Sequence, residues 1–272
     1  MKRSLLLAGL LTLVLYSSVL AHFQMIYTPQ SALERGGETT LKLVFTHPFD
    51  GDHIMDMAPV EAFYMVHQRG EGEAVKTDLK KYLKKITWTG LENAGDAFEA
   101  KLPARVVRSM GDYVFVLVPA PYYEKADGEY IQQFTKMILN VGGVPGNWHE
   151  PLGLAAEIVP LDKPYANWTG GVFRGVVMSN GEPVPNAELE VEYLNHTPDM
   201  KKNAFTGDPK ISAPHPAFES MGIKANDRGE FTIGLPKAGW WGIAALDVVE
   251  GEHNDKEMVQ EAVLWIQVTD IE

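Results

Sequence analysis

Short apolar runs bounded by turn residues are the feature of this chain that most constrains its fold. Residues 39–45, 113–118 and 135–141 are rich in β-branched and aromatic side chains, with Gly, Asp or Pro close to their ends. Runs of this kind predict β-strands. Residues 79–86 fit either a short helix or an extended edge, and no long helical period follows residue 21. The sequence therefore predicts an all-β protein.

A second series of strand-like runs follows residue 171, at 172–177, 187–193, 230–233, 240–246 and 262–268. Turn signals such as Asn180-Gly181, typical of a hairpin, separate these runs, and this spacing is typical of β-sandwiches. We expect a junction near residues 160–171. It divides the chain into an N-terminal β-sandwich domain at 22–163 and a C-terminal one at 164–272.

The second unit resembles transthyretin-like and carboxypeptidase-regulatory-like β-sandwiches. The resemblance lies in a G-x-V opening that leads to G-x-P-V-P-x-A, at residues 175–189, and in a D-x-x-G-x-F to L-P-x-A-G stretch at 227–239. It implies a fold but says little about function, because such modules are mostly scaffolds. Residues 195–220 form a long polar insertion in this unit.

The first 21 residues read as a secretory signal peptide. Lys2 and Arg3 precede an apolar stretch at 5–16, and Val19 and Ala21 supply the small-residue pattern before a cleavage site. The apolar run is too short for a membrane span. We therefore expect a periplasmic protein with no transmembrane anchor in the mature chain, beginning at His22.

An N-terminal His carries a free amine and an imidazole on one residue, so it can chelate a metal ion without a fold to hold it. Imidazole suits nickel, copper and zinc. The alternative is that cleavage simply leaves a His there. Because of this chelating capacity, we take His22 as the leading candidate ligand.

The composition limits the chemistry of any such site. The chain has no Cys, which excludes disulfides, thiolate ligands and Cys nucleophiles. Its formal charge is −12, and removal of Lys2 and Arg3 gives −14. This balance argues against nucleic-acid binding, which needs a basic face. An acidic surface favours cations, although solubility explains most of these carboxylates.

A polar loop follows the strand predicted at 39–45. Residues 47–57 concentrate two imidazoles, His47 and His53, with three carboxylates and two thioethers. If residues 22–29 pair beside that strand, His22 and His47 face one another, and His53 or His67 completes the site. The alternative is a solvated acidic loop whose Met55 and Met57 fill gaps in the core.

No established short metal or catalytic motif is present: neither His-Glu-x-x-His, nor a calcium loop, nor Gly-x-Ser-x-Gly, nor a phosphate-binding Gly-rich loop. We therefore do not expect an enzyme. Tyr122 and Tyr123 either line a site or cover a core edge. His149 is a reserve ligand candidate, whereas His196 and His253 are expected to face solvent.

The chain also resembles the periplasmic components associated with nickel and cobalt uptake transporters, whose main domain is one of unknown function. The motifs that carry this resemblance are Ala21-His22-Phe23, His47-Pro48-Phe49, Met55-Asp56-Met57, residues 111–115, 119–123, 134–136, 157–161 and 238–242. Members often end in a transmembrane helix and often have a His just before Phe-Thr-Lys. This chain ends at Ile271-Glu272 and has Gln132-Gln133 at that place.

The resemblance implies a metal-binding protein that captures or delivers Ni²⁺ or Co²⁺ for an inner-membrane transporter. The main alternative is a copper-binding protein or chaperone that holds Cu²⁺ through an N-terminal His chelate, with thioethers suited to Cu(I). A copper monooxygenase with an N-terminal His, a second His and an axial Tyr is a weaker alternative. An envelope module without metal is the fourth.

Overall fold

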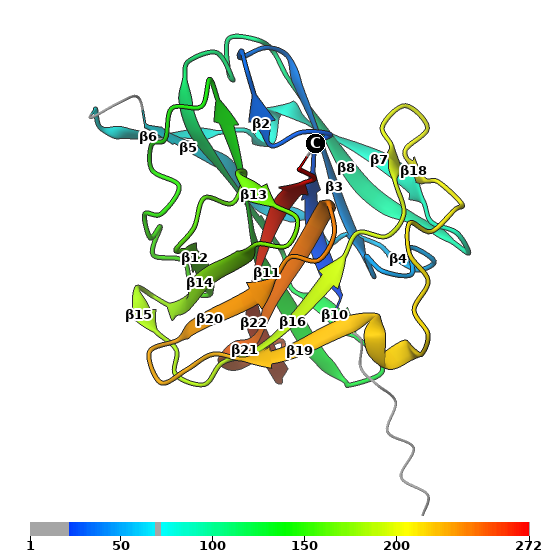
Figure 1. Ribbon diagram of the computed structural model, residues 1–272. Coiled ribbons are helices and arrows are strands. Elements are labelled where there is room, and N and C mark those ends of the chain that lie inside the picture. The colour runs from blue at the N-terminus through cyan, green and yellow to red at the C-terminus, as the bar shows by residue number, and fades with distance from the viewer. Residues whose placement is uncertain (1–21, 69–71, 272) are drawn as a thin grey trace, which may run out of the picture.

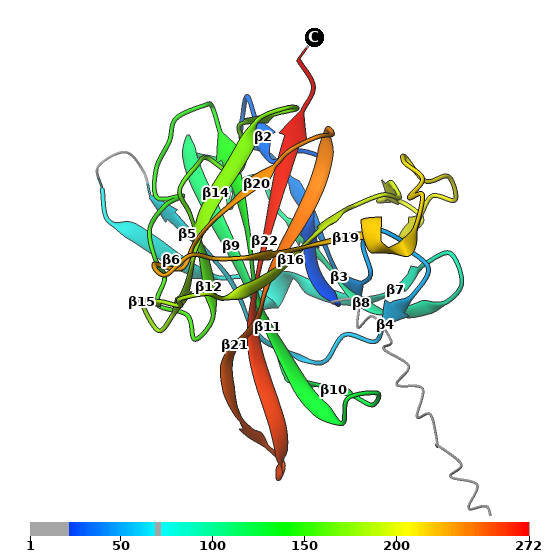
Figure 2. The same ribbon diagram turned by 60° about the horizontal axis from the view of Figure 1, so that its bottom comes forward.

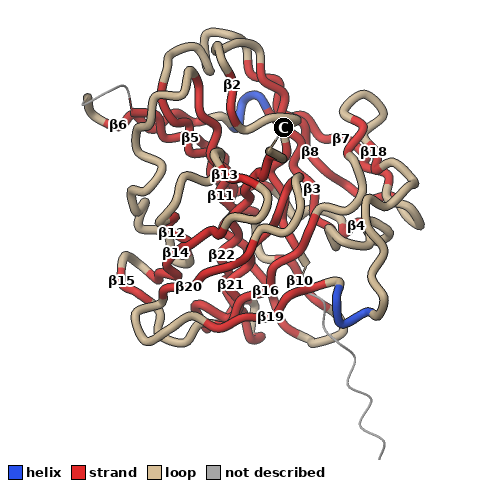
Figure 3. Tube along the Cα trace, viewed as in Figure 1, coloured by secondary structure: helices blue, strands red, loops and turns tan. Residues whose placement is uncertain are grey.

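The computed structural model describes residues 22–68 and 72–271, where β-strands account for nearly all of the regular structure (Figure 3). Helix in these ranges is limited to two single 3-10 turns, η1 (Lys80–Tyr82) and η2 (Pro216–Phe218). The prediction of an all-β protein is confirmed. Residues 79–86 divide between η1 and the strand β7 (Leu83–Thr89), so both readings of that stretch are partly right.

The described strands form three sheets (Figure 1). The seven-stranded sheet has the order β1 (Phe23–Tyr27), β3 (Thr39–Thr46), β8 (Ala94–Leu102), β7, β18 (Ala204–Phe205) and β17 (Pro198–Asp199), with β4 (Ile54–Met55) paired to β3. The four-stranded sheet consists of β12 (Glu157–Pro160), β14 (Val172–Ser179), β15 (Glu182–Pro183) and β20 (Glu230–Gly234).

The 11-stranded sheet has the order β19 (Ser220–Lys224), β16 (Glu188–Tyr193), β21 (Gly239–His253), β22 (Lys256–Thr269), β11 (Glu129–Val141), β9 (Gly111–Pro119), β5 (Val60–Gln68) and β6 (Ala74–Asp78). Three short strands add to it: β2 (Ala32–Leu33) and β10 (Tyr122–Glu124) pair with β11, and β13 (Asn167–Trp168) pairs with β22.

The 11-stranded sheet lies between the other two, and its central strands are buried on both faces. On β9, Phe115 and Leu117 belong to a hydrophobic core shared with the seven-stranded sheet, whereas Val114 and Val116 belong to a second core shared with the four-stranded sheet. Consecutive side chains of a strand point to opposite faces. The unbroken apolar run at 113–118 is therefore the pattern of a strand covered on both sides.

Two sandwiches are thus present, one on each face of a common sheet. Strand β22 pairs in parallel with β11 from Tyr130 opposite Met258 to Met137 opposite Trp265, so hydrogen bonds join segments from both sides of the junction expected at residues 160–171. The boundary between residues 163 and 164 stays a prediction, but it does not separate one sheet from another.

A buried ion pair links the central sheet to the four-stranded sheet. Lys136 Nζ on β11 lies 2.7 Å from Glu157 Oε1 on β12, and both side chains are almost fully buried. The Glu157 carboxylate also accepts hydrogen bonds from the backbone N–H groups of residues 152–154. These bonds satisfy a charge that burial would otherwise penalise strongly.

Breaking this pair from one side should be costly. Lys136→Met leaves the Glu157 carboxylate buried without its cation, so we expect the free energy of unfolding to fall by about 3–5 kcal/mol. Arg174→Met is the matched control, because it removes the cation of the exposed pair between Arg174 and Asp162, and should have little effect. Urea unfolding measures both variants. Equal losses would contradict the role given to burial.

Candidate metal centre

The pairing of β1 with β3 brings the first described residue next to the loop that follows β3. The two strands are antiparallel with Phe23 opposite Thr46, so His22 and His47 are the next residues beyond that pair. Residues 23–27 thus pair beside β3, which is the condition on which the predicted approach of His22 to His47 depended. Residues 1–21, and with them the expected signal peptide, lie outside the described residues.

The rings of His22 and His47 are close enough to share one metal ion. Their centroids are 4.6 Å apart, with 43° between the ring planes. A metal ion about 2 Å from one nitrogen of each ring places the centroids roughly 4.5–6.3 Å apart, depending on the ligand angle. The ring of His53 lies at 6.3 Å from that of His47, at the upper end of this range.

Aromatic and acidic side chains enclose His22. The ring of Phe45 lies 5.5 Å from it and the ring of Tyr122 lies 6.3 Å from it, centroid to centroid. Glu124 Oε2 approaches His22 Nε2 to 3.7 Å, and the two side chains are each 14% exposed. Tyr122 thus lies beside the candidate site and also packs against the first hydrophobic core, so it has both of the roles that its sequence context allowed.

This enclosure decides the protonation state of the His22 ring. Burial, together with the neighbouring His47 and His53, lowers the pKa of His22 to about 4, although Glu124 acts in the opposite direction. The folded chain therefore holds this imidazole neutral near pH 7, with a lone pair on one ring nitrogen. A neutral imidazole is the form that binds a metal ion.

Gln133 on β11 fixes the backbone that carries His22. Its Oε1 accepts a hydrogen bond from Gln24 N at 2.6 Å, and its Nε2 donates to the carbonyl oxygen of His22 and to Glu261 Oε2. Sequence reasoning treated this Gln only as a departure from the family pattern. A polar side chain just before the strand predicted at 135–141 was the signal that it could have a partner.

His67 does not join this group. It lies on β5 near its end, where its ring stacks on Tyr113 at 4.0 Å and its Nδ1 hydrogen-bonds with the Asp112 carbonyl oxygen. The other end of β5, at Val60, pairs with Pro119 beside the site. Seven residues of strand span about 23 Å. His67 is therefore too far from His22 and His47 to complete the site, contrary to the hypothesis.

The two thioethers of the loop face the protein interior. Met55 and Met57 both belong to the first hydrophobic core, and Met57 Sδ accepts a hydrogen bond from Gln24 Nε2 at 3.4 Å. His196, expected in solvent, is buried, and its Nδ1 hydrogen-bonds with the Thr206 carbonyl oxygen. Sequence could not show this, because the insertion around it folds onto Gly51.

Side chains alone do not complete a site. In residues 22–68 and 72–271, no group of three or more His, Cys, Asp or Glu side chains is arranged to hold a metal ion. A third nitrogen donor is the α-amine of His22, which exists only after cleavage between residues 21 and 22. The candidate centre therefore requires a chain that begins at His22.

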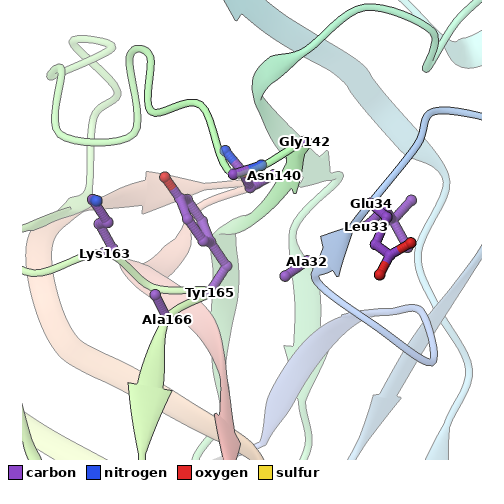
Figure 4. A pocket seen from close by; sticks show the side chains of 9 residues that line it. Ala32, Leu33, Glu34, Asn140, Gly142, Lys163, Tyr165 and Ala166 are labelled. Atoms are coloured by element: carbon purple, nitrogen blue, oxygen red, sulfur yellow. Dashed lines mark hydrogen bonds between the residues drawn. The ribbon is translucent and has the colours of Figure 1, made fainter.

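A separate cavity of about 510 Å³ opens at the other end of β11 from Gln133 (Figure 4). Lys163 and Tyr165 lie on one side, Glu34 lies on the opposite side, and Asn140 lies between them toward the top of the view. The full lining is Ala32, Leu33, Glu34, Asn140, Gly142, Gly143, Lys163, Tyr165 and Ala166. None of the four predicted ligands contributes to it.

The model of one protein family, a domain of unknown function called DUF4198, matches residues 19–248. A comparison with curated proteins found no match. No helix in the described part of the chain is long and apolar enough to cross a lipid bilayer.

Matches among solved structures have low identity. They include the ectodomain of mouse nectin-like molecule 4, with 13% identity and a TM-score of 0.19, covering 91% of this chain and 64% of that one. The D0-D1 domain of intimin has 10% identity and a TM-score of 0.21, with 91% and 100% covered. A Salmonella alpha-2-macroglobulin mutant has 10% identity and a TM-score of 0.24, with 90% and 15% covered. The chain thus spans less than two thirds of the first and a small part of the third.

Glu261, the partner of Gln133, should make stability depend on pH. Burial raises its pKa to about 8. Between pH 4.5 and about 8 the folded chain keeps a proton that the unfolded chain releases, so the free energy of unfolding should fall as pH rises. Glu261→Gln should remove this loss, which is at most about 5 kcal/mol. Urea unfolding from pH 4.5 to 8.5 measures it, and parallel profiles for the two proteins would contradict the prediction.

Proposed function

The chain belongs to the DUF4198 family, whose domain has no assigned function, and we propose that the processed protein is a periplasmic binding protein for Ni²⁺ or Co²⁺. It captures the ion and delivers it to an inner-membrane transporter. The metal is cargo in this proposal, and no catalytic step is assigned to it.

One observation carries the proposal: His22 directly precedes β1, and its ring lies 4.6 Å from that of His47. Cleavage before His22 adds an amine on the same residue, which gives a chelate of amine and ring nitrogen with a second imidazole beside it. All three donors are nitrogen atoms, and nitrogen ligands suit Ni²⁺, Cu²⁺ and Zn²⁺. The donors present therefore fit a first-row transition metal.

The resemblance to nickel and cobalt uptake components supports delivery of the ion to a transporter. Two imidazoles and an amine leave further coordination positions for water or for ligands of a receiving protein, as a site that must release its ion requires. The negative charge of the chain supports capture, because it raises the local concentration of cations.

Copper is the second candidate, favoured by Tyr122. Its ring lies 6.3 Å from that of His22, centroid to centroid, and copper monooxygenases that begin with His use an axial Tyr. Cu²⁺ binds such donors more tightly than Ni²⁺ or Co²⁺ in the usual order of stability, so affinity alone does not identify the cargo. Elemental analysis of protein purified from periplasm with its native N-terminus distinguishes the two.

Processing comes first among the tests. Exported protein should begin at His22, because Val19 and Ala21 suit signal peptidase. Intact mass and N-terminal sequencing of the periplasmic fraction measure this. A start at any other residue would remove the amine from the site.

Binding should need the native amine and both rings. His22→Ala, His47→Ala and an extra Gly before His22 should each weaken Ni²⁺ and Cu²⁺ binding by about 100-fold or more, because each removes a donor or the chelate. The control is His253→Ala, since His253 lies on β21 against Tyr130, and it should bind like the unaltered protein. Titration calorimetry measures all four. Full affinity in the Gly-extended protein would overturn the chelate.

The pH dependence of binding should follow the amine rather than the His22 ring. Because the pKa of that ring is about 4, its proton competes little above pH 5. An α-amine titrates near 7.7–8.0. Affinity for Ni²⁺ should therefore rise between pH 6 and pH 8 in the unaltered protein, and more weakly in the Gly-extended one.

A further inference from the structure

We propose that Glu124 is a positioning residue of the metal centre, the carboxylate that orients the His22 ring and fixes its tautomer so that Nδ1 is free to bind the ion. The inference rests on the proposed function, because it concerns the same chelate. It assigns a role to a residue outside the ligand set.

Chelation by an N-terminal His has a fixed geometry. The amine and Nδ1 lie on the same side of the residue and close a ring with the metal, whereas Nε2 lies at the far edge of the imidazole. In the structure it is Nε2 that faces Glu124, with Oε2 3.7 Å away and both side chains 14% exposed. The edge of the ring not used by the chelate therefore faces a carboxylate.

A carboxylate beside the remote nitrogen is the usual outer partner of a metal-bound His, and at 3.7 Å Glu124 lies just beyond hydrogen-bond distance of that nitrogen. When one ring nitrogen binds the ion, the other carries the proton and donates it to a carboxylate or carbonyl, which fixes the tautomer and the ring orientation. The negative charge of Glu124 also favours the cation directly, since water is largely excluded from the pair. Loss of such a partner typically costs 10- to 100-fold in metal affinity.

Glu124 is itself held in place. Its Oε1 accepts a hydrogen bond from Ala126 N at 3.0 Å, which leaves Oε2 toward His22. Gly128 N donates to the Glu124 carbonyl oxygen and closes the turn between β10 and β11. Tyr122, two residues earlier on β10, lies on the same face of the strand, and its ring is also near His22.

One hairpin thus holds both parts of His22. Glu124 on β10 faces the ring, and Gln133 on β11 binds the backbone. Figure 2 shows this hairpin projecting from the body of the molecule beside the ends of β21 and β22. The ring and the backbone carbonyl of His22 are therefore held by the same hairpin.

Pulsed EPR of the Cu²⁺-loaded processed protein tests the inference, because the remote nitrogen of a bound imidazole gives a signal sensitive to its hydrogen bond. Glu124→Gln keeps an oxygen for Ala126 N–H but removes the charge. Asp127→Asn in the same turn is the matched control. We expect Glu124→Gln to change the remote-nitrogen signal and to weaken Ni²⁺ and Cu²⁺ binding about 10-fold. Asp127→Asn should change neither.

The outcomes separate this inference from the proposed function. If His22→Ala abolishes binding while Glu124→Gln binds with unchanged affinity and an unchanged remote-nitrogen signal, Glu124 has no positioning role and the metal centre stands. If the unaltered protein binds neither ion, the proposed function fails, and the role of Glu124 fails with it. Thermal unfolding of each variant identifies a change that is only a loss of fold.

Discussion

The candidate metal centre and the layering of the sheets depend on how the outer edge of β1 is satisfied. On one side β1 pairs with β3, but on the other its backbone meets side chains instead of a strand. Gln24 N–H donates to Gln133, and the Gln24 carbonyl oxygen accepts from Thr135 Oγ1 and Trp265 Nε1. A buried edge without partners would be costly. These bonds therefore hold the seven-stranded sheet against the central one and leave His22 in a single position.

The polar residues of β11 connect the central sheet to a different layer on each face. Gln133 and Thr135 reach β1 on one side, whereas Lys136 reaches Glu157 on β12 on the other. Because side chains alternate along a strand, neighbouring residues serve two sandwiches. The single strand β11 thus positions the candidate site on one face and holds the four-stranded sheet on the other. The two predicted units are therefore joined through one central sheet.

Enclosure of the candidate centre changes its chemistry as well as its shape. In water an imidazole has a pKa of about 6.5, but burial lowers the pKa of His22 to about 4. The protein thereby removes the proton that would compete with a metal ion at the ring. Its cost is a less stable fold in acid, since a group with a lowered pKa destabilises the folded state as pH falls from 6.5 toward 4.

Local pattern determined most of the strands and their buried faces, but not every strand end, since β11 begins at Glu129 rather than at residue 135. The runs at 39–45, 113–118 and 135–141 became β3, β9 and β11, and the turn at Asn180-Gly181 joins β14 to β15. Sequence alone also singled out His22 and His47, because one follows a cleavage pattern and the other follows a strand. The pairing of strands that lie far apart in the sequence was determined only by the tertiary structure. It joined β22 to β11, placed His67 away from the site and brought Glu124 and Gln133 to His22. Period and turn chemistry describe a residue and its near neighbours, whereas these contacts span up to 128 positions and arise only when buried faces are matched.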